Sequence, residues 1–259
     1  MSRRFEALIK AETAANAQKR RASRGVNFSA FSVFKDKRRP IKIDFDLDPY
    51  VEEQYQKLRL HLLPNSKRAA VKVVMVAATD HGEGGTTTAA ILASTLARSG
   101  NSKILLIDAN LRTPALEQVF EPGQAYKLTG LSDRVLSEAT LDQMIYDTDI
   151  PNLSFMPCGS AVPSPSYVFD QAPIGEMLST LREQFDFVIF DGSPLRDYSD
   201  SCFLAEKVDG VILVVEAERT KAEVVRKIRK DLESTGVNIL GVVLNKKRNY
   251  IPEYLERFI

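Results

Sequence analysis

The chain has 259 residues, 44% of them hydrophobic, and a formal net charge of +1. This length and apolar content suit one large α/β domain with a buried core, and they exclude a small disulfide-rich scaffold. No apolar run approaches the roughly 18 residues of a membrane-spanning helix, and the basic N-terminus lacks the apolar region of a secretory signal, so we expect a cytoplasmic protein. Cys158 and Cys202 lack metal-ligand spacing and are expected to be reduced structural thiols.

Positive charge is concentrated at the N-terminus. Residues 1–40 carry eleven Arg and Lys residues against three acidic ones, so 11 − 3 = +8, which leaves 1 − 8 = −7 for the remainder. A basic segment on an acidic body predicts contact with an anionic membrane or an acidic partner, with nucleic acid less favoured. The alternative is a solvated tail without a partner. Broken apolar patterning predicts a flexible tail over residues 1–47, with order beginning near Asp48.

The first predicted element is a helix over residues 50–63, which Pro64 ends. The apolar residues of its inner face are Val51, Tyr55, Leu58 and Leu62. Short apolar runs rich in Val and Ile then recur, and such runs are typical of buried parallel strands. They cover residues 73–77, 104–108, 187–191, 211–215 and 239–244. Helices are predicted between them over residues 87–98, 174–184 and 221–235.

This alternation predicts a doubly wound α/β fold with a mostly parallel sheet. We expect one domain over residues 48–249 and a short C-terminal tail over residues 250–259. In such folds ligands bind beyond the carboxyl ends of the strands. Candidate site residues should therefore follow the predicted strands directly.

A glycine-rich loop follows the first strand. It reads Gly82, Glu83, Gly84, Gly85, Thr86, Thr87. Phosphate-binding loops ordinarily end in Gly-Lys-Ser/Thr, because backbone amides and a lysine bind phosphate oxygens while the hydroxyl binds magnesium. Here Gly85 occupies the lysine position. We expect these six residues to form an anion-binding nest at a helix N-terminus that lacks the fixed positive charge.

Two aspartates end predicted strands, Asp108 in one run and Asp191 in another. A single aspartate in this place is more often a turn or cap residue. Two of them at the same sheet edge as a glycine-rich loop are typical of a magnesium-nucleotide site. With the Thr86 hydroxyl they form the predicted Mg²⁺ ligand set.

Taken together, these segments resemble the bacterial tyrosine autokinases (BY-kinases) of capsule and exopolysaccharide synthesis, which are relatives of the partition and division-site P-loop ATPases. The similarity runs from about residue 53 to residue 245. The similar segments are residues 82–93, 104–114, 130–132, 156–159, 163–165, 185–194 and 241–245. The resemblance implies metal and catalytic roles for Asp108 and Asp191, a magnesium role for Thr86, and contact between Asn245 and the adenine of ATP or ADP.

The resemblance also implies a lysine at Gly85 and an aspartate at Asn110, and both are missing. Asparagine cannot accept a proton at neutral pH, so general-base assistance worth roughly 10²–10⁴-fold is lost. The missing lysine removes a charge-assisted contact of about 1.5–3 kcal/mol. We expect weak or absent catalysis. A substitute cation could come from His81, Arg112 or a neighbouring subunit.

Two further family features are reduced. The C-terminal tyrosine cluster that neighbouring subunits phosphorylate is represented by Tyr250 and Tyr254, which could equally pack on one face of a short helix. In the subunit-contact helix, Gln56 stands where an arginine is usual. We expect homo-oligomerisation through the helix over residues 50–63 to be weakened.

The leading hypothesis is a cytoplasmic, catalytically degenerate relative of these kinases, peripheral at the inner membrane through a membrane polysaccharide co-polymerase. It would regulate exopolysaccharide or capsule assembly and export. One alternative is an active ATP-dependent tyrosine autokinase with a substitute cation. The other is a positioning ATPase of the partition type, in which residues 1–40 hold an anionic membrane or DNA.

Overall fold

A computed structural model describes residues 41–43, 47–63, 71–120, 128–196 and 200–247. The helices are α2 (Pro49–Leu62), α3 (Gly85–Arg98), α4 (Leu116–Phe120), α5 (Asp133–Leu136), α6 (Leu141–Met144), α7 (Pro165–Asp170), α8 (Ala172–Gln184), α9 (Asp200–Ala205) and α10 (Ala222–Ser234). The strands are β1 (Val73–Ala78), β2 (Ile104–Asp108), β3 (Tyr146–Asp147), β4 (Leu153–Met156), β5 (Phe187–Gly192), β6 (Gly210–Glu216) and β7 (Ile239–Asn245). The predictions for residues 1–40, Tyr250 and Tyr254 lie outside the described residues.

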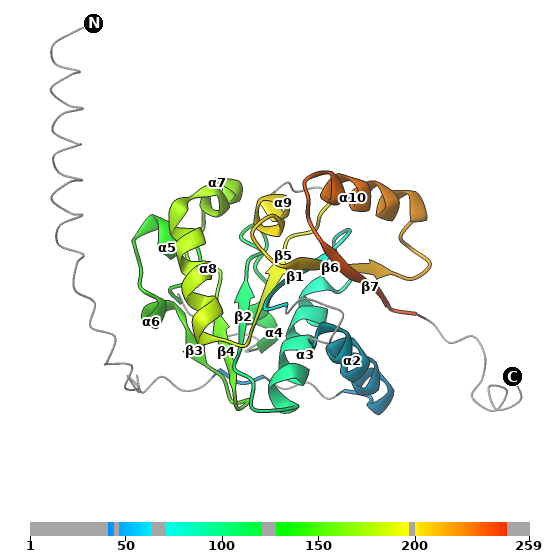
Figure 1. Ribbon diagram of the computed structural model, residues 1–259, viewed down its shortest axis with the longest axis horizontal. Helices are drawn as coiled ribbons and strands as arrows, with labels where there is room; N and C mark the ends of the chain where they lie inside the picture. The colour runs from blue at the N-terminus through cyan, green and yellow to red at the C-terminus, as the bar shows by residue number, and fades with distance from the viewer. Residues whose placement is uncertain (1–40, 44–46, 64–70, 121–127, 197–199, 248–259) are drawn as a thin grey trace, which may run out of the picture. The chain divides into compact units, whose positions relative to one another are not determined.

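The strands of the described residues form one seven-stranded sheet in the order β3-β4-β2-β5-β1-β6-β7 (Figure 1). All neighbouring pairs are parallel except β3 with β4, which is antiparallel. The predicted doubly wound, mostly parallel fold is confirmed. Because β1, β2 and β5 are adjacent and parallel, their carboxyl ends share one edge of the sheet.

Helices cover both faces of the sheet (Figure 1). One face packs against α7, α8, α9 and α10 through a core that includes Phe169, Leu178, Leu204 and Ile228. The other packs against α3, with Leu62 of α2 and Leu116 of α4 in the same core. Burial on both faces explains why the central strands read as continuous apolar runs.

Helix α3 begins two residues earlier than the predicted start at residue 87. Gly84 precedes it with φ +92°, a left-handed conformation that glycine adopts without a Cβ penalty. The chain therefore turns from β1 into α3 within the glycine-rich loop itself. Asp48 begins α2 in a different way, because its carboxylate accepts a hydrogen bond from Tyr50 N at 2.8 Å.

Three features differ from the sequence expectations. Strand β7 lies at the edge of the sheet, so Val242 and Leu244 are 54% and 58% exposed, and the expectation of a fully buried strand is wrong there. Val51 in the first turn of α2 is exposed, although Leu62 near its end is buried. Strands β3 and β4 were not predicted, because they span only two and four residues.

Residues that precede α2 already contact the sheet and its core. Ile41 forms an isolated parallel bridge with Thr148, and Ile43 is buried in the core on the α3 side. The proposed tail boundaries at residues 47 and 250 stay predictions. Within the described ranges, no helix has the length and apolar content to cross a bilayer.

Candidate functional site

The loop between β1 and α3 has the strand-loop-helix form that a phosphate cradle requires. Gly82 and Gly84 both have positive φ, at +77° and +92°. A Cβ at Gly84 would lie 2.2 Å from Asn245 Nδ2, so the chain passes too close to β7 for any side chain. The Thr88 amide donates to Gly84 O at 2.9 Å and closes the first turn of α3. This is the loop geometry that the predicted anion nest requires, and the nest itself stays a prediction.

Glu83 braces the loop from inside. Its side chain is 1% exposed. Oε2 accepts hydrogen bonds from Thr79 N (2.9 Å), Thr79 Oγ1 (2.6 Å) and Asp80 N (2.9 Å). Oε1 accepts one from the Thr220 hydroxyl. Since the carboxylate is fully engaged, only the backbone amide of Glu83 is left to contribute to ligand binding.

Asn245 ties the end of β7 to the same loop. Its Nδ2 donates to Glu83 O at 2.8 Å, and its Oδ1 accepts from Lys246 N at 2.9 Å. The family resemblance implied a contact between Asn245 and adenine, which stays a prediction, and the structure brings Asn245 against the loop backbone. Its side-chain amide holds the loop in shape.

The two strand-terminal carboxylates face each other across neighbouring strands. Asp108 of β2 and Asp191 of β5 are direct register partners, and both are 0% exposed. Neither Asp191 oxygen accepts a hydrogen bond from the described residues. Buried, unpartnered carboxylate oxygens are costly, and a bound cation or a shared proton would remove that cost.

Burial is the main cause that raises the pKa of both groups. It raises the pKa of Asp191 well above its usual value, with the Asp108 charge adding to the rise and the nearby Thr86 hydroxyl opposing it. The pKa of Asp108 rises to about 7, although its oxygens accept backbone hydrogen bonds from Leu116, Asn110 and Ala115. The pair resists carrying two charges unless a cation compensates them.

This donor set fits magnesium. Mg²⁺ takes one or two protein carboxylates and completes its octahedron with water and phosphate oxygens, so a site with three protein carboxylates is not needed. Within the described residues no cluster of three or more His, Cys, Asp or Glu side chains could hold a metal. Asp191, Asp108 and Thr86 are the residues that would hold the ion beside the loop.

Asn110 is committed to an internal hydrogen-bond network. Its Oδ1 accepts from Ser193 Oγ (2.9 Å) and Thr113 N (3.2 Å), and its Nδ2 donates to Thr113 Oγ1 (3.1 Å). The side chain is buried, with 6% exposed. An amide held in this way cannot take a proton from an attacking hydroxyl.

The two side chains proposed from the sequence as substitute cations, Arg112 and His81, lie in different surroundings. Arg112 forms a two-pronged ion pair with the buried Asp200, through Nε to Oδ2 and Nη2 to Oδ1. His81 lies exposed at the loop tip, where its backbone amide donates to Asp80 Oδ1 at 2.7 Å.

Sequence reasoning missed three basic residues beside the loop. Lys246 Nζ donates to Gly82 O at 2.5 Å, and the Arg219 guanidinium lies 3.7 Å from the position of a Cβ built on Gly82. Arg196 Nη1 pairs with Asp80 Oδ2 at 2.9 Å. Lys246 directly follows the predicted Asn245, so this position could have been found from the sequence. The other two follow strands β5 and β6 at the same sheet edge.

The similar segments 130–132 and 156–159 meet beyond β4. Leu131 N and Ser132 N donate to the carbonyls of Pro157 and Cys158, both at 2.9 Å. A Cβ at Gly130 would lie 2.1 Å from Pro157 O, so this contact requires glycine. Burial, with the charges of Asp108 and Glu117, raises the pKa of Cys158 to about 12. The two segments are therefore held together by backbone hydrogen bonds, and the Cys158 thiol beside them is unreactive.

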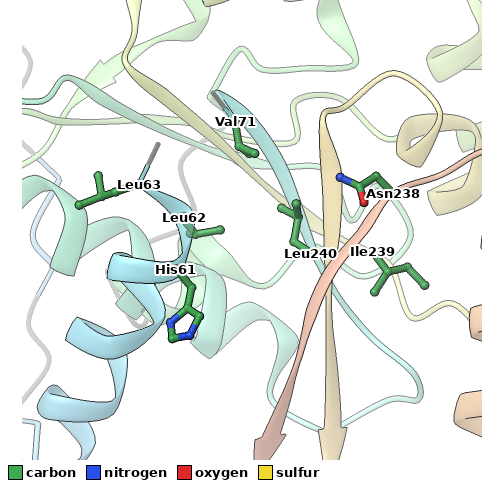
Figure 2. Close-up of a pocket in the computed structure, with 7 residues that line it drawn as sticks. All are labelled: His61, Leu62, Leu63, Val71, Asn238, Ile239 and Leu240. Carbon is green, nitrogen blue, oxygen red and sulfur yellow. The ribbon is translucent and has the colours of Figure 1, made fainter. Parts of the chain in front are cut away.

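A hollow of about 320 Å³ opens at the opposite end of the sheet (Figure 2). It lies between the end of α2 and the start of β7, and five of its seven lining residues are apolar. The lining residues are His61, Leu62, Leu63, Val71, Asn238, Ile239 and Leu240. Val71 precedes β1 whereas the loop follows β1, so this hollow is separate from the loop and its carboxylates.

Comparison with known proteins agrees with this geometry. Residues 71–238 match the family model described as an AAA domain, which fits a phosphate loop and two strand-terminal carboxylates on a parallel sheet. The tyrosine-protein kinase CpsD of Streptococcus pneumoniae serotype 4 (strain ATCC BAA-334 / TIGR4) is 34% identical over 203 residues, which cover 78% of this chain and 87% of that protein. The tyrosine-protein kinase YwqD of Bacillus subtilis (strain 168) is 30% identical over 196 residues, or 76% of this chain and 81% of that one. The chain belongs to the bacterial tyrosine-kinase family.

Solved structures of bacterial kinase domains and of a related ATPase share the fold of this chain. The VpsO kinase domain is 29% identical and superposes with a TM-score of 0.66, covering 78% of this chain and 100% of that one. The septum site-determining protein MinD of Pyrococcus horikoshii OT3, solved with Mg-ADP, gives a TM-score of 0.57 at 24% identity over 72% of this chain and 76% of that one. At 24% identity, the similarity to MinD shows a shared fold and nothing more.

Proposed function

We propose that this chain is a nucleotide-binding member of the tyrosine-kinase family whose own phosphoryl transfer is impaired or lost. One combination of observations carries the proposal. The loop, Asp108 and Asp191 keep the frame of a magnesium-nucleotide site, while Gly85 lacks the loop cation and the Asn110 amide is held in a buried network.

Binding is supported independently of the missing lysine. Backbone amides at the start of α3 attract phosphate through the helix dipole and through direct hydrogen bonds. A magnesium ion beside Asp191 would partner carboxylate oxygens that otherwise accept nothing from the described residues. ATP or ADP with Mg²⁺ is therefore the proposed ligand, and the metal would neutralise part of the phosphate charge.

Impaired catalysis follows from the two substituted positions. Without a lysine at Gly85, no fixed charge on the loop meets the charge that develops on the transferred phosphoryl group. Without a carboxylate at Asn110, a tyrosine hydroxyl has no general base at that position, a loss worth roughly 10²–10⁴-fold. We propose that the chain regulates and does not efficiently phosphorylate.

We propose a cytoplasmic location, peripheral at the inner membrane, beside a polysaccharide co-polymerase in exopolysaccharide or capsule export. The support is family membership and the charge of +8 over residues 1–40, which would contact anionic lipid. Self-association through α2 is proposed to be weak. Gln56 Nε2 donates to Ser99 Oγ of the same chain at 3.2 Å, so this side chain is already used internally.

Calorimetric titration of the purified chain with ATP and Mg²⁺, paired with a phosphotyrosine assay, tests the proposal. We expect binding with little or no phosphotyrosine, and a gain of signal in the Gly85→Lys/Asn110→Asp double variant. Lack of nucleotide binding would contradict the proposed ligand. Strong autophosphorylation by the unmodified chain would instead support an active autokinase with a substitute cation.

A further inference from the structure

We propose that Lys246, at the end of β7, supplies the positive charge for nucleotide phosphates that Gly85 cannot supply. The inference rests on the nucleotide binding proposed above and assigns the cation of that site. It requires that Lys246 lies at the loop, can be released toward an anion, and is better placed than the other nearby cations.

The first requirement is met by two consecutive residues. Asn245 Nδ2 donates to Glu83 O at 2.8 Å, and Lys246 Nζ donates to the preceding carbonyl, Gly82 O, at 2.5 Å. Lys246 itself has φ +54°, a conformation that residues with a side chain seldom adopt. This backbone turn accompanies a side chain that lies over the loop and does not continue along the strand.

The ammonium group can turn toward phosphate at small cost. It carries three N–H donors, and it donates to Gly82 O and to Glu216 Oε2, the latter at 3.0 Å. Arg219 Nη1 also pairs with Glu216 Oε2 at 3.0 Å, so the carboxylate keeps a cation when Lys246 moves. The Lys246 side chain is 48% exposed, which leaves its flexible stem room to swing.

The charge on Glu216 explains the resting position. Its hydrogen bond from Lys246, followed by that from Arg219, lowers the pKa of Glu216 and keeps it ionised. In the absence of an anion the ammonium therefore rests between Glu216 and the loop. A polyphosphate beside the loop offers several negative oxygens to the same group.

Other basic residues near the site are held by their own partners. Arg112 is bound to the buried Asp200, and Arg196 is paired with Asp80. Arg219 pairs with Glu216 at 3.0 Å and lies beside Gly82. Lys246, by contrast, donates directly to a carbonyl of the glycine-rich loop, so its ammonium group already lies at the edge of the proposed phosphate site.

The test is equilibrium binding of a fluorescent ATP analogue with Mg²⁺ at fixed ionic strength. Lys246→Met should weaken binding roughly 10–100-fold, the loss expected for one charge-assisted contact. Lys246→Arg, which keeps the charge, should stay within about fivefold of the unmodified chain. Lys247→Met is the matched control, because it removes the same charge from the next exposed residue, and it should change the Kd less than about twofold.

A rescue variant separates a direct charge effect from damage to the loop. Gly85→Lys in the Lys246→Met background should recover most of the lost affinity, although its Cβ would lie 3.1 Å from Ala78 N and require a small shift. If Lys246→Met and the unmodified chain bind equally, or if Lys247→Met weakens binding as much, the inference is wrong while nucleotide binding stands. If the unmodified chain binds no nucleotide, the proposed function fails and this inference fails with it.

Discussion

In the metal-free protein, raising the pH from 5 to 8 should lower the stability of the fold. The folded-state pKa of Asp108 is about 7, against an ordinary value of 3.8. A carboxyl with a raised pKa holds its proton in the folded state, so its contribution is fully present below pH 3.8 and is lost as the pH rises through about 7. Asp191, whose pKa burial also raises, changes in the same direction.

The size of the effect follows from Asp108. The difference between about 7 and 3.8, at about 1.4 kcal/mol per pH unit, gives a full contribution of about 4 kcal/mol. The part that is lost between pH 5 and pH 8 is about 2–3 kcal/mol. For a domain of this size that corresponds to a fall in Tm of about 5–10 °C.

Thermal unfolding in EDTA at pH 5, 6, 7 and 8 measures this, with Asp191→Asn as the diagnostic variant. Removing that carboxylate should make the protein more stable than the unmodified chain at pH 8 and nearly equal to it at pH 5, and excess Mg²⁺ should reduce its advantage at pH 8. A Tm that is constant or rises from pH 5 to pH 8 would refute the reasoning. So would an Asp191→Asn variant that is less stable at pH 8.

Asp209 provides the opposite control. Burial raises its pKa, but hydrogen bonds from Arg182 and from the amides of Val73 and Lys72 outweigh that effect and hold the pKa below its usual value. Its stabilising contribution is therefore present above the unfolded pKa and is lost only as the pH falls below that range. Asp209→Asn should lower the Tm by a similar amount at pH 5 and pH 8, which separates the buried pair from a general effect of removing a carboxylate.

Other predictions concern the loop and the sheet edge. Gly84→Ala should cost at least about 2 kcal/mol in urea unfolding, because its Cβ would need φ +92° and would lie 2.2 Å from Asn245 Nδ2; a loss below 0.5 kcal/mol would contradict this contact. Thr220→Val should cost about 1–2 kcal/mol by removing the hydroxyl that donates to the buried Glu83, and an unchanged midpoint would show that the brace is dispensable. Leu244→Thr should change the free energy of unfolding by less than about 0.5 kcal/mol, since this side chain is 58% exposed; a large loss would mean that another surface covers it.

Most of the fold could be predicted because the central strands are buried on both faces. Continuous apolar runs identified β1, β2, β5 and β6, and helical periodicity identified α2, α3, α8 and α10. The helices of four to six residues, α4, α5, α6, α7 and α9, were not predicted. Strands β3 and β4 are too short to give a periodic signal. The exposure of β7 depends on strand order, which a run of Val and Leu does not encode.

The candidate site shows the same division between local and long-range information. The loop, Asp108 and Asp191 follow strands directly, so the sequence placed them at one edge of the sheet. It could not show that Arg112 is committed to Asp200, 88 residues away in the chain, or that Glu83 faces inward toward Thr220. Such pairings depend on side-chain packing between segments that are distant in sequence.

The contacts of β7 with the loop have a consequence for biosynthesis. Asn245 and Glu83 are 162 residues apart in the chain, and Lys246 and Gly82 are 164 apart. A nascent chain has made the glycines of the loop long before the residues that hold them in place leave the ribosome. The phosphate cradle therefore reaches its final form only after β7 has been synthesised, and a chain truncated before β7 would keep the whole glycine-rich motif without the contacts that shape it.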